Sequence, residues 1–135
     1  MSLYKTKANK LQGRTYKDIN TQALTLYRQV VTKTKRKPYV RSKYFNKEKI
    51  FLETFWQHIW QKNWRDRKRR LKFFPCALEL LRNTQIDPVS VQNPNNKSEV
   101  LHRFSGITPS KESFVVQVRE NKKNNQKWLM SVYPD

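Results

Sequence analysis

The chain is poor in glycine, cysteine and histidine, and each shortage excludes a class of protein. Its two glycines, Gly13 and Gly106, are far apart, so no glycine-rich loop can cradle phosphates as in P-loop or dinucleotide-binding enzymes. The single cysteine, Cys76, can form neither an internal disulfide nor a cysteine-rich zinc site, which favours a cytoplasmic protein. Two histidines are too few for a zinc site made mainly of histidine. We therefore expect no metal, no nucleotide and no other cofactor.

Long apolar segments and clustered carboxylates are missing as well. No run of about 18 apolar residues is present, and the chain does not start with the apolar segment of a secretory signal, so we expect a soluble protein without a membrane partner. Only five acidic residues follow residue 84, and they have no familiar metal-binding spacing. A two-metal nuclease needs several clustered Asp or Glu side chains, so the sequence does not support that chemistry.

Positive charge is what the chain has in excess. Lys and Arg together number 29 against 10 Asp and Glu, which gives a net charge of +19. Residues 1–84 hold 22 basic and 5 acidic side chains, a net charge of +17, whereas residues 85–135 have a net charge of only +2. Such an excess favours a polyanionic partner, and nucleic acid is the first to expect.

The spacing of apolar residues predicts an α+β fold with N-terminal helices packed on one face of a C-terminal antiparallel β-meander of three or four strands. Residues 1–14 are polar and basic without periodicity, which indicates a flexible basic arm. We expect one domain over residues 15–135, with a basic helical part (15–84) and a sheet part (85–135). The predicted helices cover residues 16–34, 46–63, 64–74 and 76–82, with Asn46 as the N-cap of the second and Pro75 in the first turn of the last.

Three strands are predicted over residues 100–107, 113–120 and 127–133. In the register that makes one face of the last hairpin apolar, the facing pairs are Val118 with Trp128, Val116 with Met130, and Phe114 with Val132. The opposite, polar face then carries Gln117, Lys127 and Ser131. For the first strand two registers remain open, since either His102 or Arg103 shares that polar face.

A basic cluster precedes the sheet part and is expected to neutralise phosphates, unless it is only a solvated helix face. The predicted nucleic-acid-binding residues are Arg65, Arg67, Lys68, Arg69, Arg70 and Lys72 of this cluster, together with Lys127. Aromatic residues interleaved with the charge, such as Tyr39, Tyr44 and Trp64, are candidates either for stacking on unpaired bases or for the core.

His102 is the best catalytic candidate because imidazole titrates near neutral pH. It could accept the proton of a ribose hydroxyl or protonate the leaving oxygen, while Arg103 and Lys127 stabilise the charge on the phosphorane. Gln117 and Ser131 could hold the scissile phosphate by hydrogen bonds. The alternative is a strand histidine that is satisfied by a neighbour, with Gln117 and Ser131 as ordinary polar residues of a hydrated sheet face.

Three segments near the end of the chain resemble the C-terminal sheet of the phage-associated barnase/EndoU/colicin/RelE-like (BECR fold) nucleases. They are Leu101–Ile107 with its His-Arg-Phe and glycine, Ser113–Lys122 with Phe-Val-Val-Gln, and Lys127–Pro134 with a serine and a Tyr-Pro end. The resemblance implies helices followed by an antiparallel sheet and metal-independent RNA cleavage by a toxin-like or mobile-element protein. By position it implies catalytic roles for His102, Arg103 and Ser131, with Gln117 nearby.

The leading hypothesis from the sequence is thus a metal-independent endoribonuclease that grips RNA with basic helices and cleaves it on the sheet face by general acid-base chemistry. Such an enzyme could have an antitoxin or immunity protein as a second partner. The alternative is a non-enzymatic RNA- or DNA-binding accessory protein, whose binding would survive loss of His102 but not of the basic cluster.

Overall fold

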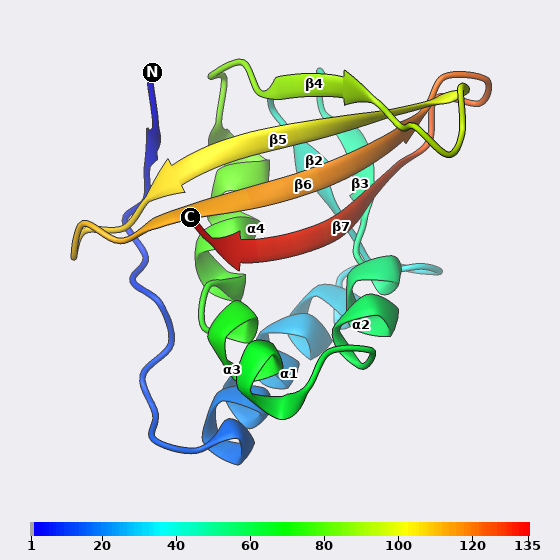
Figure 1. The fold of residues 1–135 in the computed structure, drawn as a ribbon. Helices are drawn as coiled ribbons and strands as arrows, with labels where there is room; N and C mark the ends of the chain where they lie inside the picture. Colours follow the sequence, from blue (N-terminus) through cyan, green and yellow to red (C-terminus); the bar gives the residue numbers. More distant parts are fainter. Residues whose placement is uncertain (1) are drawn as a thin grey trace.

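The computed structural model describes residues 2–135 and shows helices and strands that alternate along the chain (Figure 1). In chain order the elements are β1 (Tyr4–Lys5), α1 (Tyr16–Thr32), β2 (Tyr39–Ser42), β3 (Glu48–Phe51), α2 (Glu53–Ile59), α3 (Trp64–Leu71), α4 (Phe74–Asn83), β4 (Val89–Gln92), β5 (Glu99–Ile107), β6 (Ser113–Asn121) and β7 (Lys127–Pro134). Within residues 2–135, none of the helices has the length and apolar character that a membrane crossing requires.

The predicted topology is wrong, although the protein is α+β. All strands join one seven-stranded sheet. Six of them follow the order β1-β5-β6-β7-β3-β2, and the seventh, β4, pairs with β5, as β1 does. The pairs β1 with β5 and β3 with β7 are parallel, and the others are antiparallel. The helices therefore lie between strands in the sequence, instead of preceding an antiparallel meander of three or four strands.

Residues 39–51 form a β-hairpin, where the sequence predicts a loop and the start of a helix. Asn46 and Lys47 have positive φ angles of 55° and 67°, as the turn between β2 and β3 requires. Asn46 is therefore a turn residue and not a helix N-cap. Ile50 and Phe51, which lie within the helix predicted over 46–63, belong to β3, and α2 starts only at Glu53.

The other helices follow the sequence closely. Thr15 caps α1, because its hydroxyl accepts a hydrogen bond of 3.1 Å from the Asp18 amide. Pro75 lies in the first turn of α4, as predicted from its missing amide hydrogen. The helix predicted over 64–74 is split, since α3 ends at Leu71 and α4 begins at Phe74.

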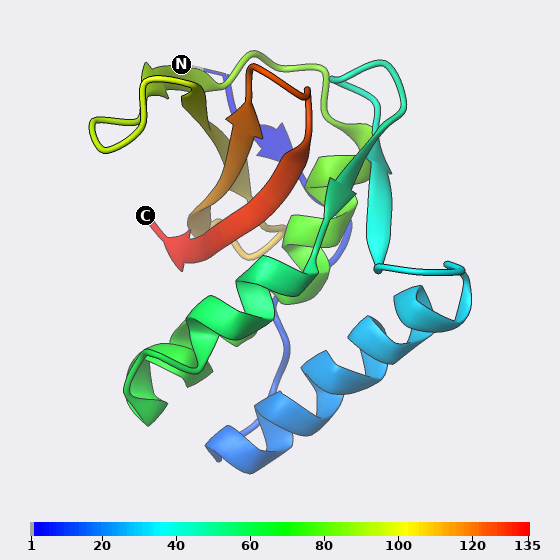
Figure 2. The same cartoon turned by 90° about the vertical axis from the view of Figure 1, so that its right-hand side faces the viewer.

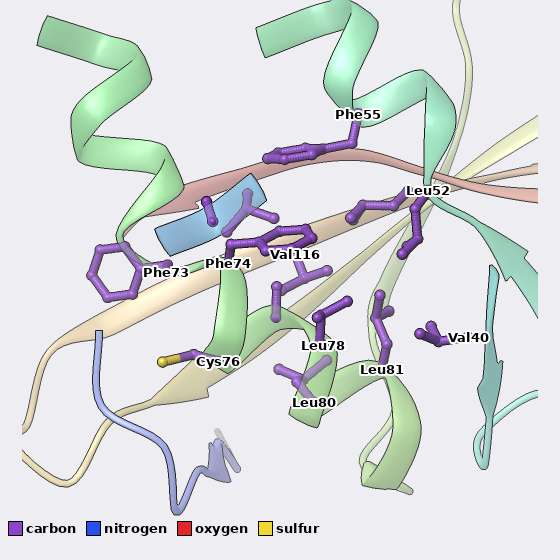
Figure 3. Packing of buried hydrophobic residues seen from close by; sticks show 14 of the residues in the cluster. Val40, Leu52, Phe55, Phe73, Phe74, Cys76, Leu78, Leu80, Leu81 and Val116 are labelled. Carbon is purple, nitrogen blue, oxygen red and sulfur yellow. The ribbon is translucent and has the colours of Figure 1, made fainter. Parts of the chain in front are cut away.

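Helix α4 lies in the hollow of the curled sheet and forms the centre of the core (Figure 2). Its buried side chains are Phe74, Cys76, Ala77, Leu78, Leu80 and Leu81. Phe74 stacks on Phe55 of α2 with ring centroids 5.6 Å apart, and Figure 3 shows both rings beside Val116 of β6. Burial of each such side chain contributes about 1.5–3 kcal/mol, so this contact area is the main attraction between helices and sheet.

A β-bulge alters the predicted register of the last hairpin. Val118 pairs with Leu129 and Gln117 pairs with Ser131, so Met130 is the extra residue on β7. On the turn side of the bulge the pairing is one residue away from the prediction, which placed Val118 opposite Trp128. Beyond the bulge it is two residues away, so Val116 pairs with Val132 and not with Met130, and Phe114 pairs with Pro134 and not with Val132. The bulge interrupts the alternation of side chains along β7, so that Leu129 before it and Val132 after it both point into the core.

We expect Gly106→Ala to destabilise the fold by about 1–3 kcal/mol, the usual cost of an overpacked core. A Cβ atom at Gly106 would lie 2.5 Å from Cζ of Phe114 and 3.0 Å from Cδ1 of Leu80. Both side chains are fully buried, and Phe114 stacks on Phe73 and cannot move away. Urea unfolding measures the change. Ser105→Ala, the next residue of the same strand, is the control and should shift stability by less than about 0.5 kcal/mol; equal stability of both variants would contradict the packing.

Candidate nucleic-acid interface

Helix α3 presents the basic cluster and is well capped at its start. The side chain of Asn63 accepts a hydrogen bond of 2.9 Å from the Asp66 amide. Asp66 in the first turn and three basic residues in the last turn, Lys68, Arg69 and Arg70, complement the helix dipole. Leu71 is fully buried and anchors the helix to the core.

The cationic side chains of α3 have different partners. Arg69 and Arg70 pair with the Asp66 carboxylate at 2.9 and 3.1 Å. Burial would raise the pKa of Asp66, but the hydrogen bonds from both arginines outweigh this and hold the pKa below its usual value. Arg67 donates to the carbonyl oxygens of Lys62 and Trp60 at 2.6 and 2.8 Å, so it stabilises the turn between α2 and α3.

A cleft of about 640 Å³ opens beside α3 and gathers cations from three separate segments. Its basic lining residues are Lys10 of the N-terminal segment, Arg65, Lys68, Arg69 and Lys72 at α3, and Lys111 of the β5–β6 turn. Its acidic lining residues are Glu112 and Asp135. In Figure 1 the N-terminal segment, α3, the β5–β6 turn and the end of β7 lie on the same side of the molecule. The lining thus carries six positive groups against two negative side chains.

The crowding of these cations is visible at Lys72. Burial lowers the pKa of its ammonium group, and the neighbouring charges of Lys10 and Lys68 lower it further, against a smaller opposite effect of Glu112. Lys10 itself forms an ion pair of 2.6 Å with Glu112. An anion bound here would relieve the repulsion among the lysines, so the cleft is electrostatically suited to phosphate groups.

The N-terminal segment forms one wall of the cleft and is held by Glu79 of α4. The Glu79 carboxylate accepts hydrogen bonds from the Tyr4 hydroxyl and from the amides of Lys7 and Ala8, all within 3.0 Å. Burial and the hydrogen bond to Glu79 raise the pKa of Tyr4 to about 12. The sequence predicts residues 1–14 as a flexible arm; in the structure residues 4–5 form β1 and Leu11 donates to Lys72, while Met1 lies outside the described residues.

Three of the four predicted catalytic residues lie together on the outer face of the sheet. Arg103 pairs with Gln117 across β5 and β6, and Gln117 pairs with Ser131 across β6 and β7. The Arg103 guanidinium donates to the Gln117 side chain at 3.0 Å. Arg103, Gln117 and Ser131 therefore share the polar face. Of the two registers left open for the first predicted strand, the structure has the one that places Arg103, and not His102, on this face.

His102, the fourth, lies on the opposite, inner face and is 8% exposed. Its Nδ1 is 2.7 Å from the Ser90 hydroxyl, and its Nε2 is 2.8 Å from the Glu120 carboxylate. The ring of Phe45 packs against it with centroids 5.2 Å apart. His102 is therefore separated by the sheet from Arg103, Gln117 and Ser131.

Lys127 continues the polar row that starts at His102 and is only 1% exposed. Its ammonium group lies 3.5 Å from Glu120 and 3.1 Å from Glu48 of β3, and it also donates to Asn125. This side chain holds strands together in the interior and does not reach the basic cleft. Among residues 2–135, no three His, Cys, Asp or Glu side chains gather as a metal site would require.

Lys10, Lys111 and His58 are not among the residues that the sequence analysis selects for this interface. Lys10 and Lys111 line the cleft, although one belongs to the N-terminal segment and the other to a turn. His58 of α2 borders a narrow recess with Lys62, Arg70 and Ser131. The only local signal for Lys111 is its place in a Pro-Ser-Lys turn; its positive φ of 66° shows how the turn is made.

No protein-family model matches this chain, no curated protein is similar to it in sequence at a significant level, and no solved structure matches its fold at that level. A functional assignment therefore depends on the geometry of the site itself.

The row of His102, Glu120 and Lys127 predicts a loss of stability in acid. Burial raises the pKa of Glu120, but the hydrogen bond from His102 and the charge of Lys127 outweigh it, so the pKa lies below the ordinary 4.5. Ionised Glu120 therefore contributes stability above pH 4.5, and this contribution is lost as the pH falls below that value.

Glu120→Gln should accordingly flatten the dependence of the unfolding free energy on pH in this acidic range. Urea unfolding at a series of pH values from about 3 to 7 measures it. Glu53→Gln, at an exposed position of α2, is the control and should keep the dependence of the unchanged protein. The same acidic loss of stability in the Glu120→Gln variant would show that the row does not stabilise the fold.

Proposed function

We propose that this protein binds RNA through the basic cleft beside α3 and does so without cleaving it. The observation that carries the proposal is the convergence of six cations, from the N-terminal segment, α3 and the β5–β6 turn, on one cleft of about 640 Å³. Three segments that are distant in sequence would not present the same charge to one hollow if the charge served only to solvate a helix. Phosphates are the ligands that such an arrangement fits best.

Binding is favoured over cleavage because the predicted catalytic group is divided. General acid-base cleavage of RNA needs a titrating side chain within hydrogen-bond reach of the scissile group. His102 is bonded to Ser90 and Glu120 on the inner face, whereas Arg103, Gln117 and Ser131 lie on the outer face. The resemblance of the C-terminal strands to BECR nucleases favours RNA over DNA as the ligand, and the single cysteine favours the cytoplasm as the compartment.

Neutralising the cleft should abolish most RNA binding. We expect the triple variant Arg65→Gln, Arg69→Gln, Lys72→Gln to lose affinity by at least about tenfold in moderate salt and to show a shallower dependence of affinity on salt concentration, because fewer counterions are released. Fluorescence anisotropy with a labelled RNA, measured over a series of salt concentrations, checks both.

The matched control removes the same charge elsewhere. Lys35, Arg36 and Lys37 are exposed in the loop between α1 and β2, and their conversion to Gln changes the net charge by the same amount. The control should retain a salt dependence close to that of the unchanged protein. Equal losses in the two triple variants would mean that net charge alone, and not the cleft, attracts RNA.

A second function, metal-independent RNA cleavage, is favoured by the line of Arg103, Gln117 and Ser131 on the outer face. This face adjoins the cleft, since Tyr133 lies on it and the next two residues, Pro134 and Asp135, line the cleft. The histidine on this side is His58, which borders the same recess as Ser131. Burial, followed by the charges of Arg119 and Lys62, lowers the pKa of His58, which favours the neutral form that a general base requires.

The two functions are separated by an RNA cleavage assay in EDTA. The binding proposal expects intact RNA with the unchanged protein. A nuclease would cleave it, would lose at least about 100-fold in rate in the Arg103→Ala and His58→Ala variants, and would retain its rate in His102→Ala. Cleavage that depends on His102 would contradict both the proposal of binding without cleavage and that of cleavage on the outer face. An antitoxin or immunity protein is an expected partner only if cleavage is observed.

A further inference from the structure

We propose that the RNA bound at the cleft is single-stranded next to it, with unpaired bases stacked on Trp60 and Trp64. This inference rests on the proposed RNA-binding function and specifies the form of the ligand. Trp60 follows the last residue of α2 and Trp64 begins α3, so both belong to the corner between these helices, which we call the tryptophan corner (Trp60 and Trp64). In Figure 1 this connection lies at the bottom of the molecule, away from the sheet.

The exposure of these rings is unusual for their size. Trp60 is 49% exposed and Trp64 is 55% exposed, whereas Trp56, only four residues before Trp60, is 6% exposed and packs in the core. Indole rings contribute a large apolar area when they are buried, as Trp56 of α2 does. Two exposed indoles at one corner therefore indicate a surface that is covered by a ligand.

Each ring is accompanied by a guanidinium group. The Arg67 guanidinium lies 5.0 Å from the centroid of Trp60, and that of Arg65 lies 5.3 Å from the centroid of Trp64. Arg67 cannot swing freely, because it donates to the carbonyl oxygens of Lys62 and Trp60. Each indole thus has a charged neighbour able to contact a phosphate or extend the stacking surface, as occurs where proteins hold single strands.

The tryptophan corner adjoins the cleft through Trp64. Arg65, which contacts Trp64, is itself a lining residue of the cleft, and Lys68, one helical turn after Trp64, is another. A strand whose phosphates lie among these cations can therefore place a base over Trp64. The bases of a duplex are already stacked on each other and do not present their faces, so this arrangement discriminates against double-stranded RNA.

The experiment compares one labelled oligouridine of about 12 nucleotides with a duplex of the same length, both by fluorescence anisotropy. The proteins are the unchanged chain, Trp60→Ala, Trp64→Ala and the conservative Trp64→Phe. Val89→Ala is the matched control, because Val89 is 50% exposed on β4, outside the tryptophan corner. Since both indoles are exposed, thermal unfolding should be nearly unchanged in every variant, and it is measured for each.

We expect Trp60→Ala and Trp64→Ala to weaken binding of oligouridine by about 5- to 100-fold each, with little change for the duplex, and Trp64→Phe to recover much of the loss. The salt dependence should stay that of the unchanged protein, because no phosphate contact is removed. Quenching of tryptophan fluorescence by oligouridine should decrease in the Ala variants.

Other outcomes separate this inference from the function on which it rests. If the unchanged protein binds neither RNA, the proposed function fails. If the cleft variant loses binding of both RNAs while the tryptophan variants bind both normally, the cleft binds RNA and the stacking inference is overturned. Equal losses for oligouridine and duplex also overturn it. Binding of each variant to phosphatidylglycerol vesicles is measured as well. If the tryptophan variants lose only vesicle binding, the corner is a membrane-binding surface and the stacking inference is overturned.

Discussion

The buried ammonium group of Lys127 lies at the place where the curled sheet is joined, and the arrangement of both faces depends on it. Strands β3 and β7 share a single bridge pair, Phe51 with Trp128, so the backbone alone holds the β2–β3 hairpin weakly to the rest of the sheet. Lys127 adds ion pairs to Glu48 of β3 and Glu120 of β6 across this junction. The pair with Glu120 is the buried one, since the Glu48 side chain is 42% exposed. Removing one partner of a buried ion pair typically costs about 3–5 kcal/mol, because the remaining charge is left unpaired in the interior.

This junction also decides where the functional groups lie. With Lys127 turned inward, Glu120 and His102 become interior partners in the same polar row, and the outer face keeps only Arg103, Gln117 and Ser131 of the predicted catalytic group. Of the predicted nucleic-acid-binding residues, Arg65, Lys68, Arg69 and Lys72 line the basic cleft, whereas Lys127 is buried. The polar row of His102, Glu120 and Lys127 therefore stabilises the sheet, and the basic cleft beside α3 faces solvent.

The sequence was sufficient wherever local patterns decide the structure. Helix α1, the start of α4 at Pro75 and the three long strands follow from spacing, capping and turn residues. The β2–β3 hairpin was missed because Ile50 and Phe51 continue the apolar pattern of α2, and only a tertiary partner, β7, makes them a strand. The two-residue β1 has no sequence signal at all and exists because Gly106 and Ile107 offer a free strand edge.

The same reasoning explains which site residues were predictable. The cluster on α3 is contiguous in sequence and was found, whereas Lys10 and Lys111 join it only through tertiary structure. Lys127 was assigned to a solvent face because strict alternation along β7 places it with Ser131, and the bulge at Met130 breaks that alternation. A single inserted residue thus moves a charge from a predicted ligand-binding role to the interior.

The assembly of the cleft from distant segments has a thermodynamic consequence. The N-terminal segment, α3 and the β5–β6 turn all place like charges around one hollow. Burial lowers the pKa of Lys72, and the charges of Lys10 and Lys68 lower it further; this repulsion opposes the folded state. Glu79, Glu112 and Asp66 hold these segments in place despite the repulsion. A polyanion that contacts all three segments at once would bind the folded chain more tightly than the unfolded chain, so its binding would add to the stability of the fold. If RNA binds at the cleft as proposed, the charge that destabilises the free fold is therefore the charge that stabilises the complex.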